Sequence, residues 1–408
     1  MIDVKKFGSA VTLMSFEGDK IEVNKPELDK MFNNDDVKNS KIAILSVVGA
    51  FRGGKSFLLG YCLRYLYAHY PSINNPNPIR NKNWMGDKTA PLDGFEWQFG
   101  INRVTSGLIM WNDVFFHTCD ESGDKIAILL LDTQGLFDNQ STSNDNFRVF
   151  ALGTLLSSIQ IFNISTIIHE DQLQYLQFAT EFAQCFGTNQ NSNINNEKPF
   201  QKLIFLIRDF RYPKDYSYGL NGGKKYIKKI IFDGQNSQKQ ELQSVRQHIT
   251  KTFDQICCCL LPKPGTHVED GYEYDGSWSK MDIKFRDEFK EFIENILGHR
   301  SLVTKKINSI EVTGREFKNY INTYFQLFQS SHAPQIKSFA EATIENFMNE
   351  LLEKCIADFK LVEYTWEDVK CIDKIPEIYE DFRKKIMDYL KIQRKWEMIS
   401  MSKSIDKN

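Results

Sequence analysis

An eight-residue stretch, Gly49-Ala50-Phe51-Arg52-Gly53-Gly54-Lys55-Ser56, constrains the fold of this chain more than any other feature. It matches the phosphate-binding loop pattern, in which two glycines bracket four residues and are followed by Lys and Ser. An apolar run over 42–48 precedes the stretch, and leucines at helical spacing follow it from residue 58. A strand, a loop and a helix in this order surround a phosphate with backbone N–H groups and the positive end of a helix dipole. The stretch therefore predicts a site for the phosphates of a nucleotide.

The residue types of this loop have separate parts in phosphate binding. Lys55 is placed to neutralise the β- and γ-phosphates, and Ser56 is placed to ligate Mg²⁺. The candidate nucleotide-binding residues in and beside the loop are Gly49, Arg52, Gly53, Gly54, Lys55, Ser56 and Phe57. A glycine-rich turn with a purely structural role is the alternative, but it leaves the adjacent Lys and Ser unexplained.

Apolar runs recur along the first three quarters of the chain and predict further strands. The predicted strands after the loop are 108–111, 126–131, 161–164 and 203–207. They alternate with helical patterns, of which 170–186 is amphipathic, and a hairpin is predicted over 11–23. Helices that alternate with buried strands predict an α/β fold: a doubly wound, mostly parallel sheet with its ligand at the carboxyl ends of the strands. The Asn-rich segment 188–198 is predicted to be an insertion.

The strand over 126–131 runs directly into Asp132-Thr133-Gln134-Gly135. In P-loop nucleotide hydrolases, a strand that ends in Asp places its carboxylate near Mg²⁺. We therefore expect Asp132 to hold the metal ion. We expect Gln134 and Gly135 to bind the nucleotide near its γ-phosphate.

Beyond residue 300 the pattern becomes entirely helical. Thr313 and Glu316 form a capping-box signature that opens one amphipathic helix, and two more amphipathic patterns follow. The predicted organisation is a nucleotide-binding domain over 1–297, a linker over 298–313, a three-helix bundle middle domain over 314–400 and a frayed end over 401–408.

The composition of the 408-residue chain excludes several classes of protein. A net charge of −2 gives no reason to expect a nucleic-acid partner. No signal peptide is visible, and no stretch approaches the ~20 apolar residues of a membrane span. The eight cysteines lack zinc-site spacing, and Cys257-Cys258-Cys259 lies in an apolar segment. We therefore expect that the thiols are reduced and that the protein faces the cytosol.

The choice of base depends on a carboxylate that follows a strand. The Asn/Thr-Lys-x-Asp tetrapeptide of small GTPases does not follow a strand in this sequence, and Arg208-Asp209 occupies its place. Together with the loop and the Asp132 segment, this pattern resembles the atlastin family of dynamin-superfamily GTPases, with the guanylate-binding proteins as more distant relatives. The resemblance runs from about residue 10 to 330. Six motifs carry it in order: 49–59, Gly94-Phe95-x-Trp97, Arg103-x-Thr105-Ser106-Gly107, Asp132-Thr133-Gln134-Gly135 through Ser141-Thr142, Phe205-Leu206-Ile207-Arg208-Asp209 and Leu260-Leu261-Pro262-x-Pro264-Gly265.

The resemblance implies roles for individual residues. Arg52 would act as an arginine finger supplied in cis, so that the candidate catalytic residues are Arg52, Lys55, Thr105 and Ser106. Thr105 would complete the Mg²⁺ shell with Ser56, while Asp132 would hold Mg²⁺ through water. Asp209 would read guanine, and Arg208 would pack on or beside the base.

Three positions depart from the expected pattern. The family usually has Lys where Gly53 stands. The glycine of this chain therefore removes a positive charge beside the phosphates. It usually has a second Thr where Ser106 stands, and this change keeps a hydroxyl group. Leu136 stands where Ras-like GTPases place a water-orienting Gln, so we expect Thr105 and Ser106 to position the attacking water.

The resemblance also implies a function for the whole molecule. It implies a GTPase that forms a homodimer when it binds GTP and whose helical bundle then swings about the linker. Such a protein tethers and fuses membranes of the endoplasmic reticulum from their cytosolic face. Atlastins continue into a membrane anchor where this chain stops at Asn408, so we expect the chain to be the cytosolic part of such a protein. Two alternatives remain: a soluble GTPase of guanylate-binding-protein type that assembles or tethers without fusing membranes, and a nucleotide-binding module with little turnover.

Overall fold

The computed structural model describes most of the chain up to residue 329. The described residues are 4–17, 20–80, 82–97, 107–119, 122–135, 143–187, 198–233, 240–269, 271, 274–307 and 309–329. The chain divides into two compact units, Met1–Thr343 and Ile344–Asn408. All described residues belong to the first unit. The last two predicted bundle helices, the end over 401–408 and nearly all of the predicted insertion over 188–198 lie outside the described residues.

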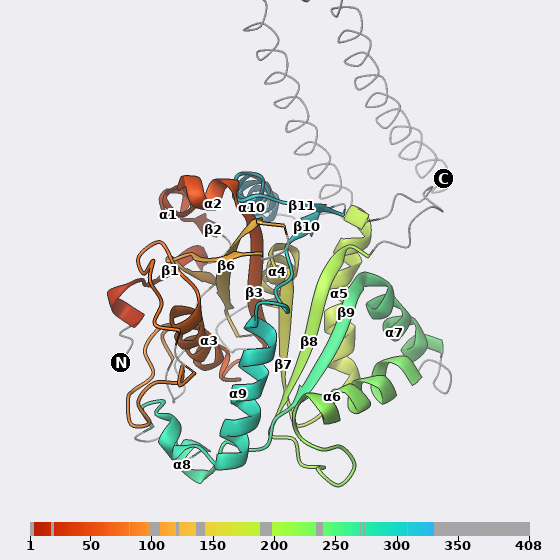
Figure 1. Cartoon of the computed structure of the whole chain (residues 1–408). Helices are drawn as coiled ribbons and strands as arrows, with labels where there is room; N and C mark the ends of the chain where they lie inside the picture. Colours follow the sequence, from red (N-terminus) through yellow and green to blue (C-terminus); the bar gives the residue numbers. More distant parts are fainter. Residues whose placement is uncertain are drawn as a thin grey trace, which may run out of the picture. The chain divides into compact units, whose positions relative to one another are not determined.

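A mixed sheet of nine strands forms the centre of the described part of the chain (Figure 1). The strands are β1 (Ala10–Glu17), β2 (Lys20–Val23), β3 (Lys41–Gly49), β4 (Leu108–Trp111), β5 (Phe115–Thr118), β6 (Lys125–Thr133), β7 (Ile159–Ser165), β8 (Phe200–Arg208) and β9 (Phe253–Leu260). Their spatial order is β2-β1-β4-β6-β3-β7-β8-β9, with β5 paired to β6. The five strands from β6 to β9 in this order are parallel, and the others pair antiparallel.

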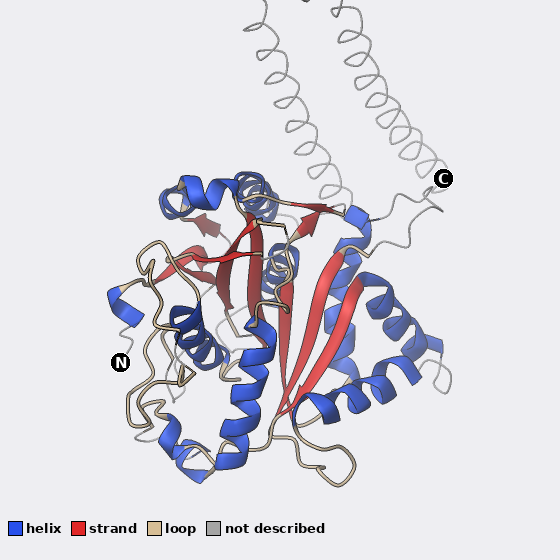
Figure 2. Cartoon of the chain, in the orientation of Figure 1, coloured by secondary structure: helices blue, strands red, loops and turns tan. Residues whose placement is uncertain are grey.

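Helices cover both faces of this sheet (Figure 2). They are α1 (Lys25–Phe32), α2 (Asp35–Asn39), α3 (Lys55–His69), α4 (Ser143–Leu156), α5 (Glu170–Gly187), α6 (Gly219–Ile227), α7 (Gln240–Thr252), α8 (Thr266–Glu269), α9 (Ile283–Leu297) and α10 (Gly314–Gln329). A π-helical turn, Lys228–Phe232, continues α6, and 3₁₀ turns occur at Val4–Lys6 and Trp278–Lys280. A separate two-stranded ribbon consists of β10 (Lys306–Ile307) and β11 (Ile310–Glu311).

Strand β3 shows how the sequence builds the two hydrophobic cores. Its apolar side chains alternate between the faces of the sheet, because successive residues of a strand point in opposite directions. Ile42, Ile44 and Val48 face the core that contains α4, α5, α6, α7 and α10. Ala43, Leu45 and Val47 face the core that contains α3 and α9. A strand buried on both faces needs the nearly continuous apolar run that the sequence contains.

The order of the parallel strands places the ligand site. Strand β3 lies between β6 and β7, so the chain leaves β3 in one direction and later returns to its other side. In open α/β sheets, ligands bind outside the carboxyl ends of the strands at such a reversal. The phosphate-binding loop, which follows β3 directly, therefore lies where the fold brings a ligand. The α/β prediction for this domain, including its mostly parallel sheet, is confirmed.

Helix α10 begins with the predicted capping box. Glu316 Oε2 accepts a hydrogen bond from the Thr313 N–H at 2.8 Å, and the Glu316 N–H donates to Thr313 Oγ1 at 3.5 Å. The side chains of Phe317, Tyr320 and Ile321 on α10 are buried in the core that also contains Ile42, Ile44 and Val48 of β3. The first helix predicted for the bundle therefore packs on the nucleotide-binding domain, and the bundle as a whole stays a prediction.

The predicted linker over 298–313 is hydrogen-bonded to the start of β3. The Lys305 N–H donates to the Ile42 carbonyl at 2.6 Å, and the Ile42 N–H donates to the Val312 carbonyl at 3.1 Å. The side chain of Lys41 forms an ion pair with Glu311 at 2.6 Å. This segment therefore lies along the amino end of the strand whose other end carries the phosphate-binding loop. The division between the two compact units falls later in the chain than this segment.

The predictions of reduced cysteines and of no membrane span can be compared with the described residues. Cys258 and Cys259 are buried on β9, and Cys257 is partly exposed. These three cysteines, together with Cys62 and Cys119, are free thiols. Within those ranges, the helices lack the length and apolar character needed to cross a bilayer.

Candidate nucleotide-binding site

The phosphate-binding loop connects the end of β3 at Gly49 to the first residue of α3, Lys55. The Gly53 N–H donates to the Ala50 carbonyl at 3.2 Å, which closes the loop on itself. A Cβ atom on Gly49 would lie 2.3 Å from the Asn163 carbonyl oxygen, so only glycine fits between β3 and β7 at this point. The sequence pattern thus has a direct steric cause.

The side chains of Lys55 and Ser56 lie at the start of α3, directly after the loop. Lys55 is 6% exposed, and its Nζ donates to the Ala50 carbonyl at 3.1 Å. Ser56 Oγ donates to Oδ2 of Asp132 at 2.5 Å. Asp132 is 1% exposed at the end of β6, whose register places it beside Val47 of β3. The hydroxyl and the carboxylate predicted as metal ligands therefore lie in direct contact.

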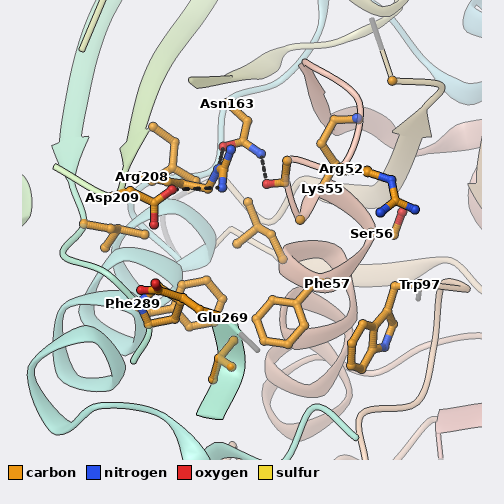
Figure 3. Close-up of a pocket in the computed structure, with 18 of the residues that line it drawn as sticks. Arg52, Lys55, Ser56, Phe57, Trp97, Asn163, Arg208, Asp209, Glu269 and Phe289 are labelled. Atoms are coloured by element: carbon orange, nitrogen blue, oxygen red, sulfur yellow. Dashed lines mark hydrogen bonds and ion pairs between the residues drawn. The ribbon is translucent and has the colours of Figure 1, made fainter. Parts of the chain in front are cut away.

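A pocket of about 320 Å³ opens beside the loop and α3 (Figure 3). Its lining includes nine of the predicted site residues, which come from the loop, from the segment after β6 and from the end of β8. These residues are Arg52, Gly53, Gly54, Lys55, Ser56, Phe57, Gly135, Arg208 and Asp209. This volume lies within the range of small-molecule sites, and both ends of the pocket carry charge.

Arg208 and Asp209 mark the end of the pocket at the carboxyl end of β8. The NH1 atom of Arg208 lies 3.4 Å from Asp209 Oδ2, and Ser165 Oγ also lies 3.4 Å from that oxygen. Burial lowers the pKa of Arg208, while the charge of Asp209 acts in the opposite direction. Asp209 has φ of 56°, a left-handed conformation that Asp tolerates better than most residues. This turn of the backbone follows β8 directly.

Asn163, on β7, connects this pair to the phosphate-binding loop. Its Nδ2 donates to the Gly53 carbonyl at 2.5 Å, and its Oδ1 accepts from Arg208 Nε at 2.8 Å. Figure 3 shows the carboxamide between Arg208 and the loop that carries Arg52 and Lys55. Asn163 is 2% exposed, so its bond to Gly53 is buried, while its bond to Arg208 is partly buried.

Aromatic side chains form the opposite wall of the pocket. Phe57, at the start of α3, packs edge-on against Trp97 with ring centroids 5.3 Å apart, and its centroid lies 6.0 Å from that of Phe289 on α9. Tyr274 lies 6.0 Å from Trp97 by the same measure. Figure 3 shows Phe57, Trp97 and Phe289 across the pocket from Asn163. These rings give the pocket an apolar side beside its charged ends.

Gln134 occupies a position behind the pocket lining. Its Oε1 accepts from the Gly107 N–H at 2.9 Å, and its own N–H donates to the Gly107 carbonyl at 2.8 Å. Gly107 follows directly on Thr105 and Ser106 in the sequence. The two segments predicted to surround the γ-phosphate are therefore joined by a pair of hydrogen bonds.

The outcome differs among the predicted site residues. Gly49, Asp132 and Gln134 lie next to the pocket without being part of its lining. Thr105 and Ser106 lie outside the described residues, as does Leu136. The individual roles assigned to all these residues stay predictions.

The sequence did not single out Asn163, and it indicated Phe57 and Trp97 without placing them in one aromatic wall with Phe289. A signal for Asn163 exists, because it is a polar residue close to the end of an otherwise apolar strand. Parallel strands present such residues at the ligand edge of the sheet. No local pattern joins Phe57, Trp97 and Phe289 into one wall, because they come from three separate segments.

The oxygen atoms of Ser56 and Asp132 fit a magnesium ion. Mg²⁺ prefers hard oxygen ligands and is usually held by one or two protein groups together with phosphate oxygens and water. Within the described ranges, no group of three His, Cys, Asp or Glu side chains forms a metal cage. A site completed by the phosphates of a nucleotide agrees with both observations.

Comparison with known proteins shows which family this chain belongs to. Residues 18–306 match the family model of the guanylate-binding protein N-terminal domain. The chain is 39% identical to atlastin of Drosophila melanogaster over 83% of this chain and 60% of the relative. It is 40% identical to human atlastin-2 over 82% of this chain and 54% of that protein. The chain thus spans little more than half the length of these relatives. On these grounds, the chain belongs to the guanylate-binding protein family of dynamin-superfamily GTPases, the group that includes the atlastins.

Proposed function

We propose that this protein hydrolyses GTP to GDP and phosphate with Mg²⁺ as its cofactor. One observation carries the proposal. A single pocket has the loop with Lys55 and Ser56 at one end and the Arg208–Asp209 pair at the other. Such an arrangement suits a nucleotide whose phosphates lie at the loop and whose base lies at the pair. A bound magnesium ion would neutralise part of the phosphate charge.

The residues of the chain supply the rest of the proposed chemistry. Lys55 binds the phosphates, and Ser56 and Asp132 hold the metal ion. Asp209 accepts hydrogen bonds from the N–H groups of guanine, and the Arg208 side chain lies beside the base. Thr105 ligates the metal ion, and Thr105 and Ser106 position the attacking water.

Arg52 is the proposed arginine finger. It lines the pocket, is exposed, and has its guanidinium carbon 5.1 Å from the centroid of the Phe51 ring. Its φ of 60° is unusual for a residue that is not glycine, and such conformations occur often at functional sites. An exposed cation on a phosphate-binding loop is free to move onto charge that develops during phosphoryl transfer.

For the whole protein, we propose a mechanochemical role of the atlastin type. GTP would favour a homodimer that forms through the nucleotide-binding domains, and the helices that follow would then rearrange. In the full protein this would tether and fuse endoplasmic reticulum membranes from their cytosolic side. The sequence similarity to atlastins over more than four fifths of the chain supports this role.

A second role is favoured by the match to the guanylate-binding protein model. In this role, GTP would drive assembly or tethering by a soluble protein without fusion of membranes. Two adjacent apolar spans of about 20 residues in the native protein would support fusion. A helical extension or a lipidation motif would support the second role.

The test is the rate of GTP turnover per molecule, measured as a function of protein concentration. We expect a turnover rate per molecule that rises with protein concentration and then saturates. The reason is that dimerisation would complete the site or hold the loops around the γ-phosphate in their active arrangement. A constant, fast rate would leave the GTPase proposal intact and contradict its dependence on dimerisation. A constant rate near zero would contradict the proposed enzyme and leave a module that only binds nucleotide.

A further inference from the structure

We propose that Asn163 is a positioning residue that couples recognition of the base to the geometry of the phosphate-binding loop. The inference rests on the proposed function, because it assigns a role within the same nucleotide site. It starts from one geometric fact: a single carboxamide bonds the Gly53 carbonyl at 2.5 Å and the Arg208 guanidinium at 2.8 Å.

Both partners determine the orientation of this carboxamide. A backbone carbonyl only accepts hydrogen bonds, and the Nε–H of arginine only donates them. Asn163 satisfies both partners only when Nδ2 faces Gly53 and Oδ1 faces Arg208. Aspartate would lose the bond to Gly53 and would place an acceptor against an acceptor. Among residues of this size, asparagine is therefore the one that serves both ends.

The bond to Gly53 sets the direction of a peptide group in the loop. In a planar trans peptide, the carbonyl and the following N–H point in opposite directions. When Asn163 holds the Gly53 carbonyl, the Gly54 N–H is directed away from Asn163. Phosphate-binding loops act through the directions of such N–H groups. Loss of this bond would release a peptide that the phosphates need in one orientation.

The bond to Arg208 keeps a cation from closing on the base-reading carboxylate. Arg208 NH1 lies 3.4 Å from Asp209 Oδ2, which is longer than an optimal charge-assisted hydrogen bond. Without Asn163, the guanidinium would lose the partner at Nε that restrains it and would turn toward Asp209. A tighter ion pair would then compete with guanine for the carboxylate.

Gly53 leaves room for the close approach of the loop to Asn163. A Cβ atom at position 53 would lie 3.0 Å from Asn163 Nδ2 and 3.4 Å from Arg208 NH2. The first distance is a tight contact and the second an ordinary van der Waals contact, so a larger residue would press on the Asn163 carboxamide. The glycine at this position thus leaves room for the short contact between loop and carboxamide.

The test compares two variants of the full 408-residue chain with the wild type. In Asn163→Ala both bonds are lost, so we expect the preference for GDP over IDP to fall about tenfold and the turnover of GTP to fall as well. IDP is the probe because hypoxanthine lacks the 2-amino group that Asp209 would bind. In Asn163→Asp the bond to Arg208 remains, so we expect the base preference to persist while turnover and GDP affinity fall.

Gln160→Ala is the matched control for loss of a buried amide. Gln160 is 1% exposed on the same strand and donates to Thr154 Oγ1 at 2.7 Å, without touching the pocket. We expect this variant to keep the base preference of the wild type even where its thermal stability falls. If Asn163→Ala does not fold, the split between base preference and turnover in Asn163→Asp decides the question.

The outcomes separate this inference from the proposed function. A wild type that neither prefers guanine nucleotides nor hydrolyses GTP would contradict the proposed function itself. A wild type that does both, with unchanged base preference in Asn163→Ala, would overturn the role of Asn163 alone. Equal loss of preference and turnover in Asn163→Asp and Asn163→Ala would also overturn it, because the two bonds would then have no separate effects.

Discussion

Ser56 Oγ donates a hydrogen bond to Asp132 Oδ2 at 2.5 Å, although 76 residues separate the two in the chain. Ser56 belongs to the first turn of α3, and Asp132 lies near the end of β6. The parallel pairing of β3 with β6 brings these two segments together. The two proposed metal ligands are thus held in place by the sheet, and the first prediction concerns this contact.

Ser56→Ala should weaken the response of the protein to magnesium. Without the hydroxyl, the magnesium concentration that half-saturates GTP turnover should rise by about tenfold or more, a loss known even for outer-shell partners of metal ligands. A magnesium titration of turnover measures this effect. Ser56→Thr is the control, because it keeps a hydroxyl at the same position and should stay close to the wild type. An unchanged magnesium response in Ser56→Ala would remove Ser56 from the metal site.

Arg52→Ala should lower the turnover number of GTP by about 10³ or more, the range of arginine-finger losses. The affinity for GDP should change much less, because the finger acts on charge that develops in the transition state. Single-turnover kinetics and GDP binding measure the two quantities. Arg80→Ala is the control, since Arg80 is also exposed with a positive φ of 50° but does not line the pocket. Equal rates for the two variants would contradict the role of Arg52.

Asp209→Asn should change the base preference from guanine toward xanthine. The carboxamide can donate a hydrogen bond to the extra carbonyl of xanthine, whereas the carboxylate can only accept. We expect the ratio of GDP to XDP affinity to fall by about tenfold or more. Isothermal titration with both nucleotides gives this ratio. Asp215→Asn, in the exposed segment that follows, should leave the ratio unchanged.

Lys305 should make stability depend on pH. Its Nζ is buried beside the Ser157 carbonyl at 2.9 Å, and burial lowers its pKa to about 7. Between pH 7 and about 10, the unfolded chain then binds a proton that the folded protein lacks. The free energy of unfolding should therefore rise with pH in this window, by up to about 1.4 kcal/mol per pH unit from this group. Below pH 7 this contribution should be constant.

Urea denaturation at pH 7 and pH 9 measures the effect of Lys305. Lys305→Met removes the buried amine and keeps a long apolar stem, so the variant should gain stability over the wild type at pH 7 and less at pH 9. Lys306→Met, at the exposed neighbouring residue, should follow the pH profile of the wild type. Parallel profiles for Lys305→Met and the wild type would show that Lys305 keeps its proton in the folded protein.

Much of the domain follows from local patterns. The runs over 42–48, 126–131 and 203–207 lie within β3, β6 and β8, because parallel strands buried on both faces need continuous apolar sequence. The pairing of Thr313 with Glu316 appears as a capping box, because it depends on residues three positions apart. Strand β5 and the helices α6, α7 and α9 were not predicted from the sequence.

The sequence by itself determined the phosphate-binding loop, since its spacing of Gly, Lys and Ser reflects the local shape of a strand–loop–helix turn. It also placed Arg208 and Asp209 at the end of a strand. Only the tertiary structure decided that Asn163 joins these two regions. The register pairs Gly49 with Asn163 and Ser165 with Arg208, which brings three distant segments to one edge of the sheet. Strand order and register depend on crossovers and packing over the whole domain, so no local pattern contains them.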